Sequence, residues 1–240
     1  MAEAAPKPPR QPAFRVLVFS KTAIYVHKCI PAGIAALRAL ADRTRLFTLD
    51  ATEDAETFTP DILAGYATVI FLHTIGPILN TPQLAALQSY IRGGGGFIGI
   101  HGAAGGNLDS EWYGRLVGAQ FADHPAPEEG TLVIEDAGHE IMSRSAGGER
   151  RWMDEWYNFK THPRENDSLH VLVRGDTSSF KGGKMGVDHP LVWCQEFDGG
   201  RSFFTALGHF DEAYRDEWFM GQLQQAILWT TGGSGEAKVN

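Results

Sequence analysis

Apolar runs of strand length alternate with helix-like segments through the first half of the chain, and this alternation constrains the fold more than any other feature. The run Phe14–Ser20 is followed by a helical pattern over Ile30–Leu40, with Pro31 in its first turn. Thr44–Leu49 and Ala67–Leu72 have strand character, and the latter is apolar enough for burial on both faces. Strands and helices that alternate in this way predict a parallel sheet with helices on both faces.

Two helix starts and a further strand extend the pattern. Thr59-Pro60-Asp61 and Thr81-Pro82 are both typical of a helix N-terminus, and apolar residues recur at helical spacing after the second one. Gly93 is placed to end that helix in the left-handed conformation. The segment Gly96–Ile100 then predicts a fourth buried strand.

Shorter strand candidates and less helix distinguish the second half of the chain. The extended segments are 132–134, the region around 156–159, 169–173, 191–197 and 202–207. Gly199-Gly200 suits a hairpin turn between the last two, and Asp216 is placed to cap a helix that runs through Trp229. We therefore predict an α/β fold, with a doubly wound, mostly parallel sheet and an antiparallel extension in the second half.

Composition and charge narrow the classes of partner. The formal net charge is −8 with no run of Lys or Arg, which argues against a nucleic acid partner. No apolar run approaches the roughly 20 residues of a membrane span, and the two cysteines show no CxxC spacing. We expect a cytoplasmic protein with a disordered tail over 1–12, one domain over 13–232 and a tail over 233–240; the sequence leaves a homo-oligomer open.

Histidines follow several of the predicted strands. His73 directly follows the third strand, His101 follows the fourth, His209 follows the segment 202–207, and His27 lies in the loop after the first. In open α/β sheets, ligands bind outside the carboxyl ends of the strands. Four of the nine histidines thus lie on the edge where a ligand would bind.

His101 has the most informative surroundings. The segment Gly99-Ile-His-Gly-Ala103 is typical of a strand-to-helix elbow, where small neighbours let one side chain project over the sheet. A nucleophilic Ser or Cys commonly occupies such an elbow, whereas an imidazole serves as a general acid, a general base or a metal ligand. The sequence therefore disfavours an acyl-enzyme mechanism.

A second candidate segment is Asp154-Glu-Trp-Tyr-Asn-Phe159, which carries two adjacent carboxylates and a tyrosine. If this segment is extended, its side chains alternate, so only one of Asp154 and Glu155 faces the site. A divalent metal stays open, because imidazole and carboxylate suit zinc and related ions, although no HExxH spacing is present. We expect no nucleotide cofactor, because the GxGxxG match at 94–99 leads into a strand and does not open a helix.

Several separated motifs, in order, resemble the ThuA-like (trehalose utilisation) family from about Phe14 to Trp229. They are the segments 18–23 with His27 and 30–33, then 94–103, 154–159, 188–190 and 200–209. The resemblance implies a class I glutamine amidotransferase-like, flavodoxin-related fold and an association with sugars oxidised to keto-glycosides. The family's motif positions fall on His27, His101, Asp154, Glu155, Tyr157 and His209. One departure is that the family's aromatic-Arg-His stretch reads Tyr25-Val-His27 here, so a cation is missing at that point.

Two kinds of function are therefore compatible with the sequence. The first is an enzyme that acts on a small carbohydrate or keto-glycoside by acid/base chemistry, as an isomerase, lyase or hydrolase, with a metal ion as one option. The second is a non-catalytic carbohydrate-binding module that reuses an amidotransferase-like scaffold without its nucleophile. This alternative draws on the tryptophans that could stack on sugar rings, Trp112, Trp156, Trp193 and Trp218.

Overall fold

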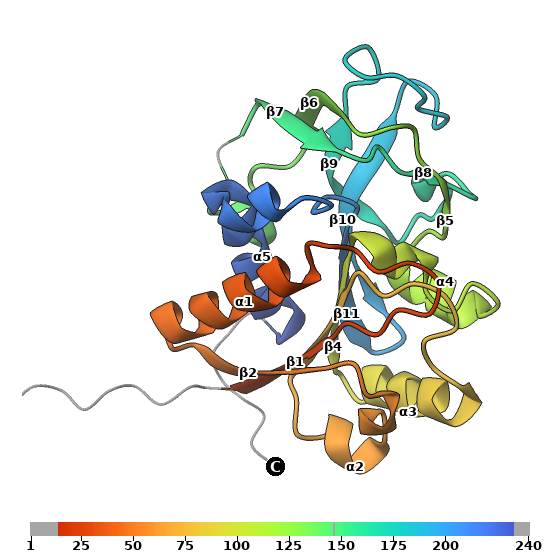
Figure 1. Cartoon of the computed structure of the whole chain (residues 1–240), viewed down its shortest axis with the longest axis vertical. Helices are drawn as coiled ribbons and strands as arrows, with labels where there is room; N and C mark the ends of the chain where they lie inside the picture. Colours follow the sequence, from red (N-terminus) through yellow and green to blue (C-terminus); the bar gives the residue numbers. More distant parts are fainter. Residues whose placement is uncertain (1–13, 146, 233–240) are drawn as a thin grey trace, which may run out of the picture.

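A nine-stranded sheet runs through the protein, whose computed structural model describes residues 14–145 and 147–232 (Figure 1). Five of its strands are parallel neighbours, in the order β2 (Phe47–Thr52), β1 (Phe14–Phe19), β3 (Thr68–Leu72), β4 (Gly96–Ile100) and β11 (Gly200–Thr205). This order is that of flavodoxin-like doubly wound folds. The carboxyl ends of all five strands therefore meet at one edge of the sheet.

The sheet continues from β11 into an antiparallel extension. Its strands are β10 (His189–Phe197), β9 (His170–Gly175), β6 (Glu128–Ile134) and β7 (Glu149–Asp154), in that order. Two further short strands, β5 (Phe121–Asp123) and β8 (Asn158–Phe159), pair with each other outside this sheet. The predicted class, a doubly wound parallel sheet with an antiparallel extension, is confirmed.

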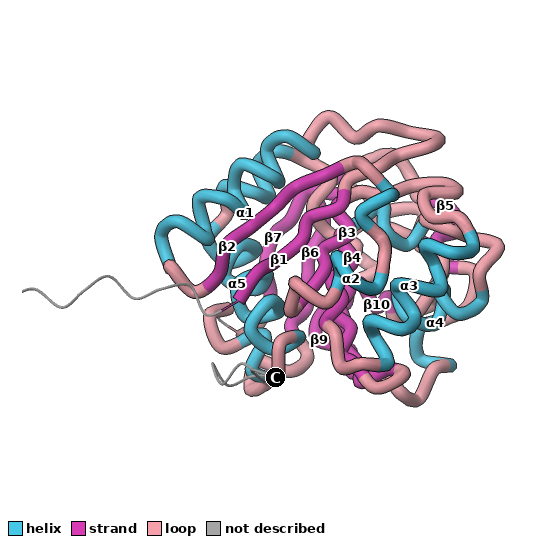
Figure 2. Tube along the Cα trace, turned by 90° about the horizontal axis from the view of Figure 1, so that it is seen from below, coloured by secondary structure: helices cyan, strands magenta, loops and turns pink. Residues whose placement is uncertain are grey.

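Helices cover both faces of the parallel strands (Figures 1 and 2). The helices α1 (Ile30–Thr44) and α5 (Glu217–Thr230) lie on one side, and α2 (Pro60–Leu63), α3 (Thr81–Arg92) and α4 (Glu111–Val117) lie on the other. Every residue of β3 and β4 is buried, as expected of strands that are covered on both faces. No helix in the described ranges is long and apolar enough to cross a membrane.

Most predicted elements are confirmed, although several of their ends differ by a few residues and α4, β5 and β7 were not predicted. Thr59 and Asp216 cap α2 and α5 through their side chains, as predicted. The strand predicted from Thr44 begins only at Phe47, because α1 continues through Thr44 and ends where Arg45 takes a left-handed φ of 53°. The two predicted tails lie outside the described residues.

Gly93 ends α3 as predicted, but its conformation differs from the prediction. Gly93 caps α3, and its N–H donates to the carbonyl of Ser89 at 3.0 Å, but its φ is −76°, so it is not left-handed. Gly94 makes the left-handed turn instead, with a φ of 92°. A glycine in this position loses no side-chain contact and avoids the strain that other residues would suffer.

The edge strand β7 packs back onto the start of α5. The ring of Trp152 lies 5.7 Å from the ring of Trp218 and 5.8 Å from that of Phe219, and Arg150 forms an ion pair with Asp216. Trp152 is almost fully buried in this contact. The packing brings the end of β7 to the loop that follows β11, although β7 is four places from β11 in the sheet.

Candidate functional site

His101 directly follows β4, with a left-handed backbone φ of 50° and a fully buried side chain. Histidine is among the few non-glycine residues enriched in this conformation, and such strained positions concentrate at functional sites. The ring Nδ1–H donates to the carbonyl of Ala206 at 2.6 Å. Because a carbonyl only accepts, this contact leaves Nε2 of a neutral ring with its lone pair free.

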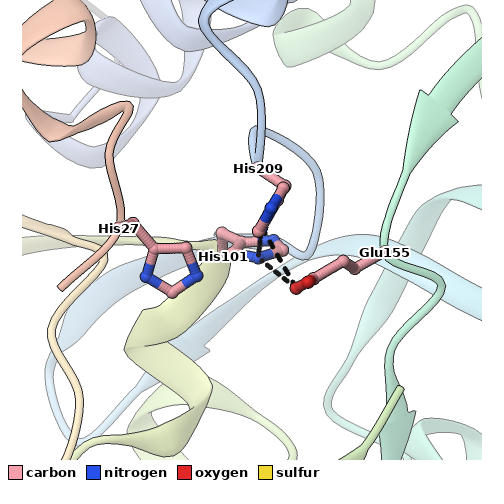
Figure 3. A group of neighbouring side chains, drawn as sticks. All are labelled: His27, His101, Glu155 and His209. Atoms are coloured by element: carbon pink, nitrogen blue, oxygen red, sulfur yellow. Dashed lines mark hydrogen bonds and ion pairs between the residues drawn. The ribbon is translucent and has the colours of Figure 1, made fainter. Parts of the chain in front are cut away.

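Three donor atoms converge at this point (Figure 3). Nε2 of His101 lies 3.2 Å from Oε2 of Glu155 and 3.3 Å from Nδ1 of His209. The third side of the triangle, from His209 Nδ1 to Glu155 Oε2, measures 3.1 Å. His101 follows β4, Glu155 follows β7 and His209 follows β11. The triangle therefore joins the parallel strands to the edge of the antiparallel extension.

His27, in the loop after β1, belongs to the same group. One donor atom from each of His27, His101, Glu155 and His209 lies within 4.8 Å of the other three. The His27 ring is buried, 5.0 Å from the ring of His101, and its Nδ1 has no hydrogen-bond partner among the described residues. Burial, followed by the positive charge that His101 and His209 can carry, lowers the pKa of His27 to about 3.

Glu155 and His209 stabilise each other's charged forms. Burial opposes ionisation of Glu155, but its hydrogen bonds with His101 and His209 outweigh burial and hold its pKa well below the usual range. Burial also opposes a charged His209 ring, yet the contact with Glu155 raises the pKa of His209 above 6.5. The His209 side chain is 17% exposed and that of Glu155 is 9% exposed, so the cluster is reachable from solvent.

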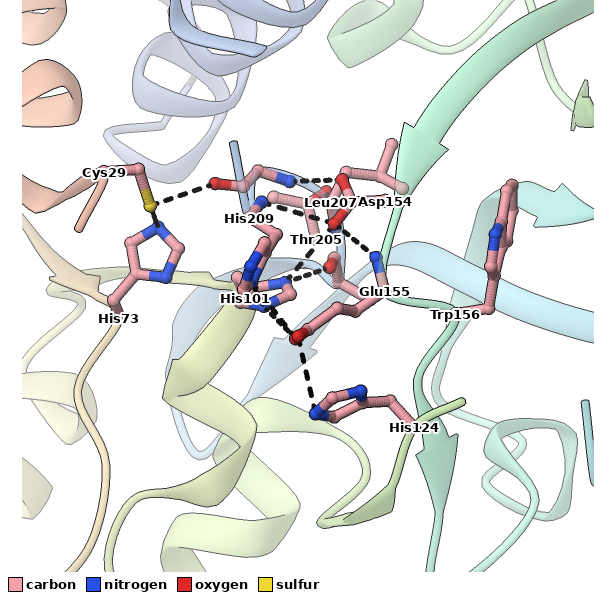
Figure 4. Close-up of polar contacts among 12 residues, drawn as sticks. Cys29, His73, His101, His124, Asp154, Glu155, Trp156, Thr205, Leu207 and His209 are labelled. Atoms are coloured by element: carbon pink, nitrogen blue, oxygen red, sulfur yellow. Dashed lines mark hydrogen bonds and ion pairs between the residues drawn. The ribbon is translucent and has the colours of Figure 1, made fainter. Parts of the chain in front are cut away.

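Asp154 lies outside this triangle, with its carboxylate 3.9 Å from Nδ1 of His101, and orders the backbone around the triangle (Figure 4). Its carboxylate accepts hydrogen bonds from the N–H of Gly208 at 2.8 Å and of Glu155 at 2.9 Å, and more weakly from His209 at 3.3 Å. The indole N–H of Trp152 donates to the same carboxylate at 2.8 Å. Glu155 is thus the carboxylate that faces the histidines, and Asp154 is a positioning residue.

Tyr157 covers the cluster from the side of the extension. Its ring lies 4.3 Å from the ring of His101, and the side chain is buried. Burial, with the nearby carboxylates Glu155 and Asp154, raises the pKa of Tyr157 well above 10. The phenol therefore stays protonated and limits the access of water to one face of the His101 ring.

His73 lies beside the cluster but outside it. Its backbone φ is 55°, its side chain is fully buried, and its Nε2 contacts the hydroxyl of Tyr214 at 2.7 Å. The same nitrogen lies 3.3 Å from Sγ of Cys29. Burial raises the pKa of the Cys29 thiol to about 12, which leaves it protonated and a poor nucleophile.

His124 approaches the cluster, and sequence reasoning missed it. Its Nε2 lies 3.5 Å from Oε1 of Glu155, and its side chain is about one-third exposed. It directly follows the short strand β5, which was not predicted from the sequence, so no predicted strand end or motif marks it. The pairing of β6 with β7 places the loop before β6, which carries His124, beside Glu155.

The fold and the site together define a class: a flavodoxin-like α/β protein with a histidine–carboxylate cluster at the strand ends. The elbow after β4 holds an imidazole in place of a nucleophile. The chain belongs to the ThuA family, described as trehalose utilisation, because the family model matches residues 15–230.

Solved structures support the same fold. A ThuA-like protein from Bacteroides uniformis superposes with a TM-score of 0.77 at 21% identity, over 95% of each chain. A cytoplasmic protein from Salmonella typhimurium gives a TM-score of 0.63 at 12% identity, over 90% of this chain and 99% of that one. A β-galactosidase from Bacillus circulans sp. alkalophilus gives 0.56 at 13% identity, over 92% of this chain but 31% of that one. No curated protein matches the sequence significantly.

Proposed function

We propose that this protein is an enzyme that acts on a sugar or keto-glycoside by proton transfer, as an isomerase, lyase or hydrolase. One observation carries the proposal: two imidazoles and a carboxylate touch at 3.1–3.3 Å at the edge where such sheets bind ligands. Groups of this kind can remove and return a proton next to a carbonyl or hydroxyl. The choice of a carbohydrate as the substrate rests on the family's description, trehalose utilisation.

The residues take different roles in this proposal. His101 and His209 are the candidate acid and base, and His209 is the more accessible of the two. Glu155 orients both rings, Asp154 positions Glu155 and His209, and Tyr157 shields His101. The partner is a small carbohydrate. A cytoplasmic location is part of the proposal, supported by a similar fold in a protein described as cytoplasmic.

The test is turnover of a panel of disaccharides and their 3-keto forms. The informative variant is His101→Asn, because asparagine tolerates the left-handed backbone of this position whereas alanine is strained there. We expect turnover of at least one keto form, reduced by about 100-fold or more in the variant, which is the scale of general acid/base catalysis. His170→Asn, a change at an exposed histidine of β9, is the matched control and should leave turnover intact.

A second candidate function is carbohydrate binding without catalysis. It is favoured by the occurrence of a similar fold as about one-third of a β-galactosidase chain. The tryptophans that motivated this function argue against it, because buried rings cannot stack on a sugar. All four are buried: Trp112, Trp156, Trp193 and Trp218. Saturable binding of a sugar with no product from any member of the panel would favour this function over the enzyme.

A further inference from the structure

We infer that His101, His209, Glu155 and His27 form a binding site for one divalent first-row transition metal ion. The inference concerns the same cluster as the proposed function but does not depend on it, because metal binding is measured without turnover. Figure 3 shows the four side chains pointing toward one another from four separate segments. Three arguments support the site: its geometry, its hydrogen-bond donors and acceptors, and the environment of His27.

The first argument is the size of the triangle. Its three sides, between His101 Nε2, His209 Nδ1 and Glu155 Oε2, measure 3.1, 3.2 and 3.3 Å. Ligand atoms about 2.0–2.2 Å from one metal ion lie about 3.0–3.5 Å from each other, in octahedral or tetrahedral coordination. The three atoms therefore already form one face of a coordination polyhedron of the correct size.

The second argument is the distribution of hydrogen-bond donors and acceptors among the three atoms of the triangle. The Nδ1–H of His101 is donated to the Ala206 carbonyl, which leaves the Nε2 lone pair directed at the triangle. A metal-ligating histidine typically donates its other N–H in this way, because that contact fixes the tautomer and the ring orientation. Ionised Glu155 is an acceptor only. A proton between two of the three atoms satisfies that pair, whereas a metal ion accepts lone pairs from all three at once.

The third argument is His27. Its ring is almost fully buried beside two other rings of the cluster, with Nε2 facing the triangle (Figure 3) and with Nδ1, on the far side of the ring, buried without a partner in the described part of the chain. A buried imidazole without hydrogen bonds is costly unless another interaction compensates. Its donor atom lies at most 4.8 Å from those of the triangle, so His27 is the outer member and completes the set as the fourth ligand.

The donor set indicates the class of ion. Three imidazole nitrogens and one carboxylate oxygen, with no thiolate, suit zinc, manganese, cobalt or iron(II) and do not suit the all-oxygen preference of calcium. Such an ion, with a free coordination position, polarises a carbonyl or hydroxyl oxygen bound to it. That chemistry fits a keto-sugar, which offers both groups.

The test begins with the full-length wild-type protein, purified without a metal-chelating resin. We expect elemental analysis to find about one transition metal ion per chain. After removal of metal with a chelator, the protein should bind Zn²⁺ and Mn²⁺ saturably in calorimetric titrations. Co²⁺ should give the visible absorption bands of a nitrogen- and oxygen-ligated ion. These measurements need no variant, so they stand even where a variant fails to fold.

Variants then assign the ligands. Glu155→Gln and His209→Gln should each weaken Zn²⁺ binding by at least about 10–100-fold, the loss typical of even an outer-shell partner. His27→Gln should weaken it less, because its donor atom is the most distant of the four. The control is His170→Gln, which changes an exposed histidine paired with Asp136 and should leave affinity unchanged.

Thermal unfolding separates loss of the site from loss of the fold. Zn²⁺ should raise the unfolding midpoint of the wild type, because the ion binds the folded state, and should leave that of Glu155→Gln nearly unchanged. Absence of saturable binding of Zn²⁺, Mn²⁺ and Co²⁺ to the wild type would overturn the site, as would binding that Glu155→Gln and His209→Gln leave intact. Unchanged affinity in His27→Gln would remove His27 from the ligand set. Turnover in metal-free protein would retain the proposed function without the metal.

Discussion

The parallel half of the sheet and its antiparallel extension contribute different parts of the site. The parallel strands β1, β4 and β11 are followed by His27, His101 and His209, so topology alone brings these imidazoles to one edge. The extension contributes the carboxylate, because Glu155 follows β7 at the far edge of the same sheet. The imidazoles are therefore placed by local strand ends, and the carboxylate is placed by tertiary packing.

That packing has identifiable components. The indole of Trp152 is buried against Trp218 at the start of α5, and burying an aromatic side chain contributes about 1.5–3 kcal/mol. The indole N–H donates to Asp154, whose carboxylate in turn accepts from the backbone of Gly208 in the loop after β11. A chain of contacts thus connects the extension to the parallel half at the site itself.

The largest expected effect comes from Asp154→Ala, which removes the carboxylate at the centre of these contacts. The variant leaves the buried N–H groups of Gly208 and Glu155 without acceptors, which we expect to cost about 3–5 kcal/mol of unfolding free energy. Urea denaturation measures this loss. Zn²⁺ affinity should fall as well, although Asp154 is not one of the proposed ligands, because Glu155 and His209 lose their backbone support.

Asp136→Ala is the matched control for that experiment. Asp136 also accepts backbone hydrogen bonds, from Gly138 and His139, but it lies at the surface. Its loss should cost about 1 kcal/mol or less. If Asp154→Ala costs no more than this control, the contact between the extension and the loop after β11 does not hold the site together.

The second prediction concerns the pH dependence of the unfolding free energy that a histidine of the extension contributes. His189, at the start of β10, is fully buried and donates from Nε2 to the carbonyl of Tyr157 at 2.9 Å, and burial lowers its pKa to about 4. A histidine with a folded pKa below its unfolded value of about 6.5 stabilises the fold fully above that value, and its contribution is lost as pH falls toward 4. Between pH 7 and pH 5, this loss amounts to about 2 kcal/mol.

Urea denaturation of the wild type and of His189→Gln, at both pH values and with chelator present, isolates this contribution. The wild type should lose about 2 kcal/mol more than the variant between pH 7 and pH 5, since the variant has no imidazole to protonate at this position. Equal losses in the two chains would mean that His189 does not link β10 to the segment that carries Glu155.

The difference between the two regions also explains what the sequence could predict. Strands buried on both faces and helices with Pro at the first turn are local signals, so most elements of the parallel half were predictable, although some of their ends and the whole of α4 were not. The misplaced end of α1 and the misplaced left-handed turn after α3 are positions where the stop signal is weak. Arg45 ends α1 without a glycine, and Gly93 is followed by another glycine that makes the turn.

The candidate site divides in the same way. His101, His209 and His27 could be proposed from sequence because each follows a strand, and the structure places all three in one cluster. The choice between Asp154 and Glu155 could not be made, because it depends on how β7 packs against α5. His124 could not be found at all, since its contact with Glu155 joins two loops of the extension.

The smallest expected effect tests whether the remaining histidine of the parallel half takes part in the site. Tyr214→Phe removes the hydroxyl that contacts His73 Nε2 at 2.7 Å and should cost about 1 kcal/mol of unfolding free energy. Zn²⁺ affinity and turnover should change by less than about threefold, because His73 contributes no donor atom to the cluster. Urea denaturation and Zn²⁺ titration measure the two quantities. A loss of affinity as large as that in Glu155→Gln would show that the buried row of His73 and Tyr214 positions the cluster, so that both regions would then depend on tertiary packing.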